Sequence, residues 1–306
     1  MTLKLGLVGL GKIATTQHLP AIAATEGVAL AAIASRHARL PDLPGYPDID
    51  TLLANEPEID AISLCTPPAG RFDQARAALA AGKHVMLEKP PGSSISEVRL
   101  LSAMAEARGL TLFASWHSRM AGAVEPARQV LAGRTIRSVA IEWKEDVLRW
   151  HPGQEWIWQP GGLGVFDPGI NALSIATYIL PEGFFVEDAD LYFPTNRAAP
   201  IAASLRGRTA SGLPVTADFD WRQTGPQTWD ITIQSDEGPV MLSGGGSHFT
   251  VDGYPRVCGE DGEYRKLYST FVALVGKRAS DVDLSPLVHV ADAFLLGRHR
   301  QVEPFG

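Results

Sequence analysis

Short apolar runs alternate with stretches of helical periodicity through the first 119 residues of the chain. This alternation predicts a parallel sheet, because parallel neighbouring strands need a long crossover connection, usually a helix. The predicted strands are Leu3–Val8, Ala29–Ala34, Ala61–Leu64, His84–Leu87 and Thr111–Ala114, and the predicted helices are Thr16–Ala24, Arg71–Ala81 and Ile95–Arg108. Ligands of such sheets bind outside the carboxyl ends of the strands. We therefore expect functional residues in the turns that follow these strands.

The pattern changes after a predicted helix at Glu125–Leu131. Alternating apolar and polar residues predict antiparallel strands at Ser138–Trp143, Val215–Trp221, Trp229–Ile233 and Val240–Leu242. Helical patterns occupy Leu163–Leu180, Glu263–Leu274 and Ser285–Leu296. A length of 306 residues favours two hydrophobic cores over one. We predict an α/β domain over 1–119 and an α+β domain over 120–306.

The net charge of −7 argues against nucleic acid or an anionic membrane as the main partner, because both attract basic surfaces. A small neutral or cationic ligand fits this charge better. The chain enters an apolar strand directly after Met1, without the pattern of a secretory signal. It also lacks an apolar run of about 20 residues, the length needed to span a bilayer. These features predict a cytoplasmic protein.

A glycine-rich turn follows the first predicted strand. Its residues, Gly9, Leu10, Gly11, Lys12, Ile13 and Ala14, form a G-x-G-x-x-A motif that opens a helix. The first glycine permits a tight turn, the second permits close approach of a pyrophosphate, and the small last residue permits close packing. Free N–H groups at the helix start then face the phosphates. The motif predicts a dinucleotide-binding domain of Rossmann type, although a merely tight turn would have the same glycines.

The second predicted strand ends in Ser35 and Arg36, where an acidic residue would select NAD. A hydroxyl and a guanidinium suit a 2′-phosphate through charge-assisted hydrogen bonds. We therefore predict that NADP is the preferred cofactor and that NAD is also used. The alternative is that these residues form a solvated basic loop.

The next two predicted strands end in polar turns. The third is followed by Cys65, Thr66 and Pro67, which we expect beside the cofactor, and the fourth by Glu88 and Lys89. A lysine is most often a solvated surface charge. At the carboxyl end of such a strand, however, it can lie near the nicotinamide and act in proton transfer. Glu88 is expected to be its counter-charge or a cofactor contact.

At these residues the chain resembles the family of glucose-fructose oxidoreductases and inositol dehydrogenases, which carries a Glu-Lys-Pro signature. Within that family it is most similar to the bacterial L-arabinose and D-galactose 1-dehydrogenases. The motifs that carry the resemblance are Lys12–Ala14 with Gln17–Pro20, then His84–Pro91, Phe113–Arg119, Trp143–Pro152 and Gly161–Asn171. The resemblance implies an N-terminal Rossmann domain and a C-terminal domain with an open-faced, mostly antiparallel sheet. It also implies a cis peptide bond between Lys89 and Pro90.

The second motif of the family is an aspartate followed four residues later by a histidine. Here the pair is Asp167 and Asn171, as in the aldose 1-dehydrogenase branch. A neutral amide does not act as a base near neutral pH, so Asp167 or Lys89 must accept the proton. Residues i and i+4 share one face of a helix, which would let both reach one hydroxyl. The alternative is that Asp167, which precedes a proline, caps the helix.

The resemblance further places His117 beside the nicotinamide or the sugar, where a structural role for the histidine is the alternative. Asp146, Trp150 and His151 precede the Asp167 helix and combine hydrogen-bonding groups with an aromatic face. They are expected sugar contacts. Tryptophans in the predicted strands could equally serve sheet packing or a subunit contact. No histidines fall at metal-ligand spacing, so we expect no metal.

Together these features predict an aldose 1-dehydrogenase that oxidises L-arabinose, D-galactose or a related sugar at C1 to the lactone. Lys89, Asp167 and Asn171 are the predicted catalytic residues, and Lys89 and His117 are expected to contact both cofactor and sugar. Two alternatives remain, a polyol or inositol-type dehydrogenase and a dinucleotide-binding regulator without turnover. We expect a homodimer or homotetramer from the exposed sheet face.

Overall fold

The computed structural model describes residues 2–260 and 262–306 and divides them into two compact units. Unit 1 consists of residues 2–117 and 262–283, and unit 2 consists of residues 118–260 and 284–306. The first stretch of unit 1 thus ends near the predicted boundary at 119. The segment 262–283, which we predicted within the second domain, instead packs into unit 1.

Unit 1 is built on a six-stranded sheet in the order β3-β2-β1-β4-β5-β6, and every neighbouring pair is parallel. The strands are β1 (Leu3–Val8), β2 (Val28–Ala34), β3 (Gly45–Tyr46), β4 (Ala61–Leu64), β5 (His84–Glu88) and β6 (Leu112–Ser115). The chain starts at β1, proceeds outward through β2 and β3, and then continues on the other side of β1 with β4. This strand order is that of dinucleotide-binding domains, whose ligands lie at the point where the order reverses.

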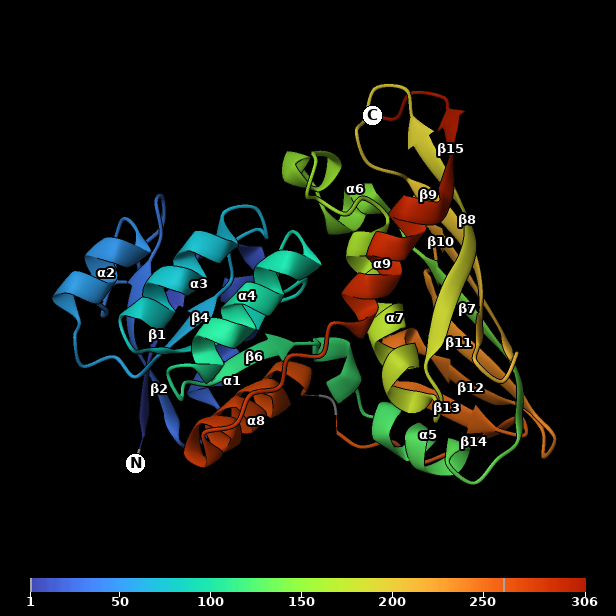
Figure 1. The fold of residues 1–306 in the computed structure, drawn as a ribbon, viewed down its shortest axis with the longest axis horizontal. Helices are drawn as coiled ribbons and strands as arrows, with labels where there is room; N and C mark the ends of the chain where they lie inside the picture. Colours follow the sequence, from blue (N-terminus) through green and yellow to red (C-terminus); the bar gives the residue numbers. More distant parts are fainter. Residues whose placement is uncertain (1, 261) are drawn as a thin grey trace. The chain divides into compact units, whose positions relative to one another are not determined.

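Helices lie on both faces of this sheet (Figure 1). One face carries α2 (Ile49–Asn55), α3 (Arg71–Ala80) and α4 (Ile95–Glu106), which contact one another in series. The π-helical turn η1 (Ala14–His18) leads into α1 (Leu19–Ala23), which contacts α8 (Glu263–Lys277) from the returning segment. Phe271 of α8 stacks on Phe113 of β6 with ring centroids 6.2 Å apart. An element distant in the chain therefore completes the core of unit 1.

Unit 2 contains a nine-stranded sheet in the order β14-β13-β12-β11-β7-β10-β9-β8-β15. Its neighbours are antiparallel except for the parallel pairs β7–β10 and β8–β15. The strands are β7 (Ile136–Lys144), β8 (Phe184–Pro194), β9 (Ala202–Thr209), β10 (Pro214–Asp220), β11 (Thr228–Ser235), β12 (Val240–Ser243), β13 (His248–Val251), β14 (Tyr254–Pro255) and β15 (Gly297–Val302). The predicted fold class is thereby confirmed for both units.

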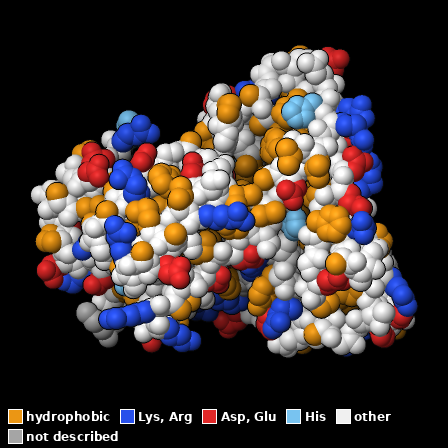
Figure 2. All heavy atoms as spheres, viewed as in Figure 1, with side chains coloured by type: hydrophobic (Ala, Val, Ile, Leu, Met, Phe, Trp, Pro, Cys, Tyr) orange, Lys and Arg blue, Asp and Glu red, His pale blue; other side chains and the backbone are white. Residues whose placement is uncertain are grey.

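The edge strand β15 is absent from our predictions because its sequence, GRHRQV, has no apolar alternation. Backbone pairing with β8 holds it in the sheet, together with ion pairs between outward-facing side chains. Arg298 and Arg300 each lie 3.0 Å from Asp190, and Arg206 of β9 pairs with Asp188. Basic and acidic side chains accordingly alternate along this edge of the sheet (Figure 2).

Helices with buried apolar residues cover one side of the sheet in unit 2. They are α5 (Val124–Leu131), α7 (Phe166–Ile179) and α9 (Ser285–Leu296), and two short helices, α6 (Val147–Trp150) and η3 (Glu155–Trp158), precede α7. The first residue of α7, Phe166, packs between Phe219 of β10 and Phe294 of α9, with ring centroids 5.7 and 5.5 Å away. A methyl group at Gly169 would stand 3.2 Å from the Phe219 ring. The start of α7 is therefore clamped tightly against the sheet.

Within 2–260 and 262–306, no helix has both the length and the apolar character to cross a membrane. The same ranges contain no group of three or more His, Cys, Asp or Glu side chains arranged to hold a metal ion.

Candidate active site

The glycine turn lies where the strand order of unit 1 reverses. Gly9 has φ +92°, and a Cβ there would stand 2.9 Å from the backbone N of Thr66 and 3.0 Å from the carbonyl carbon of Cys65. Only glycine fits this position, because β1 and β4 end side by side. A Cβ at Gly11, by contrast, would meet nothing within 4 Å. That open space, ahead of exposed Lys12 and Ile13, fits the pyrophosphate of a dinucleotide.

The loop after β2 presents a guanidinium to solvent. The backbone N–H of Ser35 donates to Tyr46 at 2.9 Å, and Arg36 is exposed directly after it. Arg39 folds back over this loop and donates to the carbonyls of Ser35 and Ala38. The loop is therefore ordered by its own arginine, which leaves Arg36 available for an anionic group.

Glu88 ends β5 and is the centre of a buried polar network. Its carboxylate lies 3.2 Å from Nε2 of His18, and it accepts from the hydroxyls of Tyr264 at 3.3 Å and Ser115 at 3.4 Å. The Nδ1 of His18 lies 2.7 Å from the hydroxyl of Tyr268. The two tyrosines belong to α8, so the returning segment closes the network. Sequence reasoning included Glu88 but missed His18, Tyr264 and Tyr268.

The pKa of Glu88 is lowered and the pKa of His18 is raised, as in an ion pair. Burial alone would raise the pKa of Glu88, but the hydrogen bond and charge of His18, with His117 and Lys89, lower it to about 2. Burial would likewise lower the pKa of His18, yet charge interactions with Cys65 and Tyr268 and the bond to Glu88 raise it well above its usual value. Both directions favour an ionised Glu88 beside a protonated His18, and neither side chain is more than 5% exposed.

Lys89 follows this pair and is half-buried, and its peptide bond to Pro90 is cis, as expected from the resemblance. His117 lies after β6, with Nδ1 2.5 Å from a carboxylate oxygen of Glu263. The His117 ring stacks on Tyr264 at a centroid distance of 5.3 Å. The structure thus brings Glu88, Lys89 and His117 into one region of unit 1, at the carboxyl ends of β5 and β6.

In unit 2, a buried carboxylate organises the aromatic side chains that precede α7. Glu145 follows β7 and is 5% exposed. It accepts hydrogen bonds from the indole N–H of Trp221 at 3.2 Å and of Trp229 at 2.9 Å. Trp229 in turn packs against Trp150 at a centroid distance of 5.4 Å. Glu145 therefore orients two tryptophans, a role that no local sequence pattern predicts.

Asp167 lies in the first turn of α7 and is 3% exposed. The N-cap of this helix is Val165, two residues before Asp167. Nε2 of His151 lies between two carboxylates, 3.7 Å from Asp167 and 3.6 Å from Glu145. Asn171 follows one turn later on the same helix and is half-buried. Asp167 and His151 are thus brought together within unit 2.

The other expected sugar contacts have structural partners. Asp146 caps α6, with its carboxylate accepting from the backbone N–H of Leu148 at 2.9 Å. The side-chain carbonyl of Gln227 accepts from the backbone of Asp146 at 2.7 Å and from the indole of Trp150 at 3.2 Å. Gln227, which sequence reasoning missed, therefore fixes the position of both residues.

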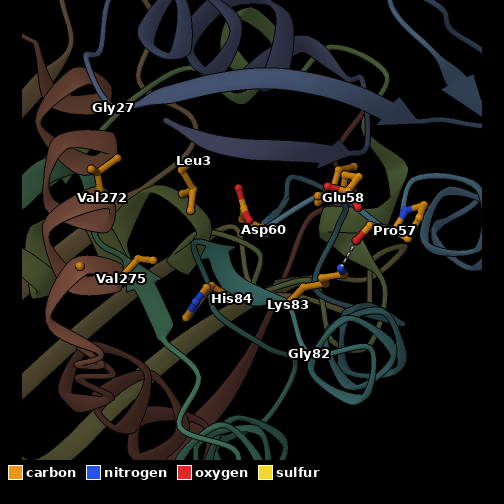
Figure 3. A pocket seen from close by; sticks show the side chains of 12 residues that line it. Leu3, Gly27, Pro57, Glu58, Asp60, Gly82, Lys83, His84, Val272 and Val275 are labelled. Atoms are coloured by element: carbon orange, nitrogen blue, oxygen red, sulfur yellow. Dashed lines mark hydrogen bonds between the residues drawn. The ribbon is translucent and has the colours of Figure 1, made fainter. Parts of the chain in front are cut away.

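A separate hollow of about 670 Å³ opens at the opposite edge of the sheet in unit 1 (Figure 3). Leu3, Asp60 and His84 line it where β1, β4 and β5 begin, and Val272 and Val275 line it from α8. The hollow lies at the amino ends of the strands, whereas ligands of such sheets bind at the carboxyl ends. The hollow is therefore separate from the residues at the carboxyl ends of the strands.

Comparisons with known proteins agree with this architecture. Residues 3–115 match an oxidoreductase family with an NAD-binding Rossmann fold. Galactose 1-dehydrogenase of Pseudomonas fluorescens is 46% identical over 99% of this chain and 98% of its own length. The crystal structure of D-galactose-1-dehydrogenase from Rhizobium etli superposes with a TM-score of 0.96, at 53% identity, over 100% of this chain and 98% of that one.

A more distant structure shares the fold. A 3-ketoreductase from Actinomadura kijaniata, solved with TDP-benzene and NADP, has a TM-score of 0.84 at 19% identity and covers 99% of this chain. The fold and the glycine turn define an NAD(P)-dependent oxidoreductase. With the full-length relative and the matched domain, the chain belongs to the oxidoreductase family with an NAD-binding Rossmann fold, which confirms the family expected from the sequence motifs.

Proposed function

We propose that this protein is an aldose 1-dehydrogenase that oxidises D-galactose, L-arabinose or a related aldose at C1 to the lactone, preferably with NADP. The observation that carries the proposal is the likeness to two galactose 1-dehydrogenases over nearly the whole length of each chain. The site supports it, because each unit supplies half-buried or buried polar groups suited to proton transfer.

The cofactor would be held by the residues at the carboxyl edge of the sheet in unit 1. Gly9 and Gly11 give the pyrophosphate access to the backbone, and Ser35 and Arg36 would bind a 2′-phosphate. The remaining proposed contacts are the turn Cys65, Thr66 and Pro67, and the side chains of Lys12, Ile13, Glu88, Lys89 and His117. When bound, the nicotinamide supplies the acceptor for the hydride that leaves C1 of the sugar.

Three side chains carry the proposed chemistry. Asp167 accepts the proton of the C1 hydroxyl while the C1–H bond breaks, which avoids a full cation at C1. Lys89 donates a hydrogen bond to the same oxygen and stabilises its developing negative charge. Asn171 holds this oxygen or its neighbour with its amide. Because His151 lies 3.7 Å from Asp167, its imidazole also helps to orient the carboxylate.

Sugar recognition would come from Trp150, His151 and Asp146, with His117 in unit 1. An aromatic face packs against the C–H groups of a pyranose, and planar polar groups bind its hydroxyls. The hydrogen bonds of Glu145 to two indoles and of Gln227 to Trp150 keep these side chains from rearranging.

A matrix of sugars against cofactors tests the proposal. We expect the absorbance of reduced nicotinamide to rise with D-galactose, L-arabinose or D-fucose, faster with NADP than with NAD, and chromatography to detect a lactone or aldonate. A keto sugar as product would instead indicate a polyol-type dehydrogenase. Absence of turnover with every aldose would contradict the proposal and favour a dinucleotide-binding regulator.

Cofactor preference gives a separate prediction. Replacing exposed Arg36 with Ala is expected to raise the KM for NADP roughly tenfold or more, since hydrogen bonds to charged groups contribute about 1.5–3 kcal/mol. The KM for NAD, which has no 2′-phosphate, is expected to stay the same. Arg76→Ala, at an exposed arginine of α3, is the matched control. Equal effects of Arg36→Ala on both cofactors would contradict the assignment.

A further inference from the structure

One buried guanidinium holds the backbone on both sides of Lys89. Arg71 is the first residue of α3 and is 2% exposed. Its Nη1 donates to the carbonyl of Glu88, which precedes Lys89, and to the carbonyl of Pro90, which follows it. Its Nε donates to the carbonyl of Thr66 at 3.1 Å, and its Nη2 donates to the same oxygen. The turn after β5 is thus tied to the turn after β4.

A second buried cation, His18, holds the side chain of Glu88, the residue before Lys89. Glu88 is paired with His18 at 3.2 Å, and hydroxyls from α8 and β6 complete its hydrogen bonds. The carboxylate of Glu88 and the carbonyls around Lys89 therefore have separate anchors, both of them buried cations of unit 1. The Lys89 side chain between these fixed groups is half-buried.

The chemistry of arginine explains why this residue occupies the position. Removing a charge from water is costly, and apolar side chains usually fill a core at lower cost. A guanidinium, however, presents several N–H donors in one rigid plane, so a single side chain can reach carbonyls at two strand ends. Lysine has one compact ammonium on a flexible chain and does not reproduce that geometry. The buried guanidinium therefore fixes the direction of the backbone at Lys89.

We propose that Arg71, assisted by His18, is a positioning residue that directs the ammonium of Lys89 toward the sugar hydroxyl. This inference rests on the proposed role of Lys89 in aldose oxidation. A lysine side chain has four rotatable bonds, so its ammonium is placed accurately only if its backbone is fixed. A misplacement of about 1 Å can lower a rate by roughly a hundredfold.

A double-mutant cycle between Arg71→Lys and Lys89→Met tests the inference. In the wild-type background, Arg71→Lys is expected to lower kcat, measured at saturating NADP, roughly 10- to 100-fold. In the Lys89→Met background, Arg71→Lys is expected to cause no further loss, because residues that act through one another are not additive. A merely structural effect would lower the rate equally in both backgrounds.

Leu52→Ala is the matched control. It also destabilises the core of unit 1, since Leu52 is fully buried, but it belongs to α2 and not to the turns that Arg71 joins. We expect it to leave kcat unchanged in both backgrounds below the melting temperature. If Arg71→Lys does not fold, His18→Gln replaces it in the same cycle.

The outcomes separate this inference from the proposed function. Full activity of Lys89→Met would refute the role of Lys89 and with it the proposed mechanism. Loss of activity in Lys89→Met, with normal kcat in Arg71→Lys or equal losses in both backgrounds, would refute the positioning role alone. Failure of both Arg71→Lys and His18→Gln to fold would assign the two cations to stability and would equally overturn the inference.

Discussion

Replacing Asp167 with Asn is expected to lower kcat for aldose oxidation by roughly 10²- to 10⁴-fold, the usual loss when general-base assistance is removed. Asn has nearly the same shape as Asp, so it keeps the packing of a side chain in the clamped first turn of α7. It cannot accept a proton near neutral pH. The KM for the sugar is expected to change much less than kcat, because the amide still forms hydrogen bonds with a hydroxyl.

Initial rates at saturating NADP, combined with the Kd for NADPH, measure this effect. Asp218→Asn, which changes an exposed aspartate of β10, is the control for the loss of one charge from unit 2. Near-normal turnover of Asp167→Asn would exclude Asp167 as the base and leave Lys89 as the proton acceptor. A parallel Lys89→Met variant is expected to lose activity to a similar degree, because the developing charge on the C1 oxygen is then no longer stabilised.

The buried pair of Glu88 and His18 predicts how stability depends on pH. The folded state lowers the pKa of Glu88 from 4.5 to about 2, so the carboxylate stabilises the fold above pH 4.5. This contribution is lost as the pH falls from about 4.5 to about 2. At about 1.4 kcal/mol per pKa unit, the loss amounts to roughly 3 kcal/mol. His18 has a raised pKa, so its contribution is complete below pH 6.5 and falls at higher pH.

Urea unfolding at a series of pH values measures this dependence. Glu88→Gln is expected to destabilise the protein by about 3–5 kcal/mol near pH 6, because it leaves a buried imidazolium unpaired. The difference in the free energy of unfolding between Glu88→Gln and the wild type should decrease by roughly 3 kcal/mol as the pH falls from about 4.5 to about 2. Glu106→Gln, at an exposed position of α4, should follow the wild type throughout. An unchanged gap between Glu88→Gln and wild type down to pH 2 would contradict the pair.

Sequence patterns predicted those features that depend on local geometry. Gly9 is required by a backbone angle of φ +92°, and the polar turns after β4 and β5 follow from where parallel strands end. The i, i+4 spacing of Asp167 and Asn171 predicted one helical face. These features are local because a few neighbouring residues determine them. The roles of Lys89, Asp167 and Asn171 stay predictions that the experiments above address.

Other features depend on contacts between distant segments, which no local pattern encodes. Arg71 stands at a predicted helix start, where an arginine is most often solvated, and only the convergence of two strand ends reveals its burial. Glu145 accepts hydrogen bonds from the indoles of Trp221, which follows β10, and of Trp229, which lies in β11. Gln227 and the tyrosines of α8 are similar cases. The sequence predicted the helix α8 but not its place in unit 1, because helical periodicity does not specify which hydrophobic core a helix joins.

The participation of α8 in unit 1 bears on how the protein acquires its fold during synthesis. All six strands of the nucleotide-binding sheet leave the ribosome well before Glu263–Lys277. Until then, the charged pair of His18 and Glu88 lacks the hydroxyls of Tyr264 and Tyr268, and Phe113 lacks its partner ring. Long-range contacts of this kind form late and slow the folding of a chain. Unit 1 should therefore complete its core only after almost all of unit 2 has been translated.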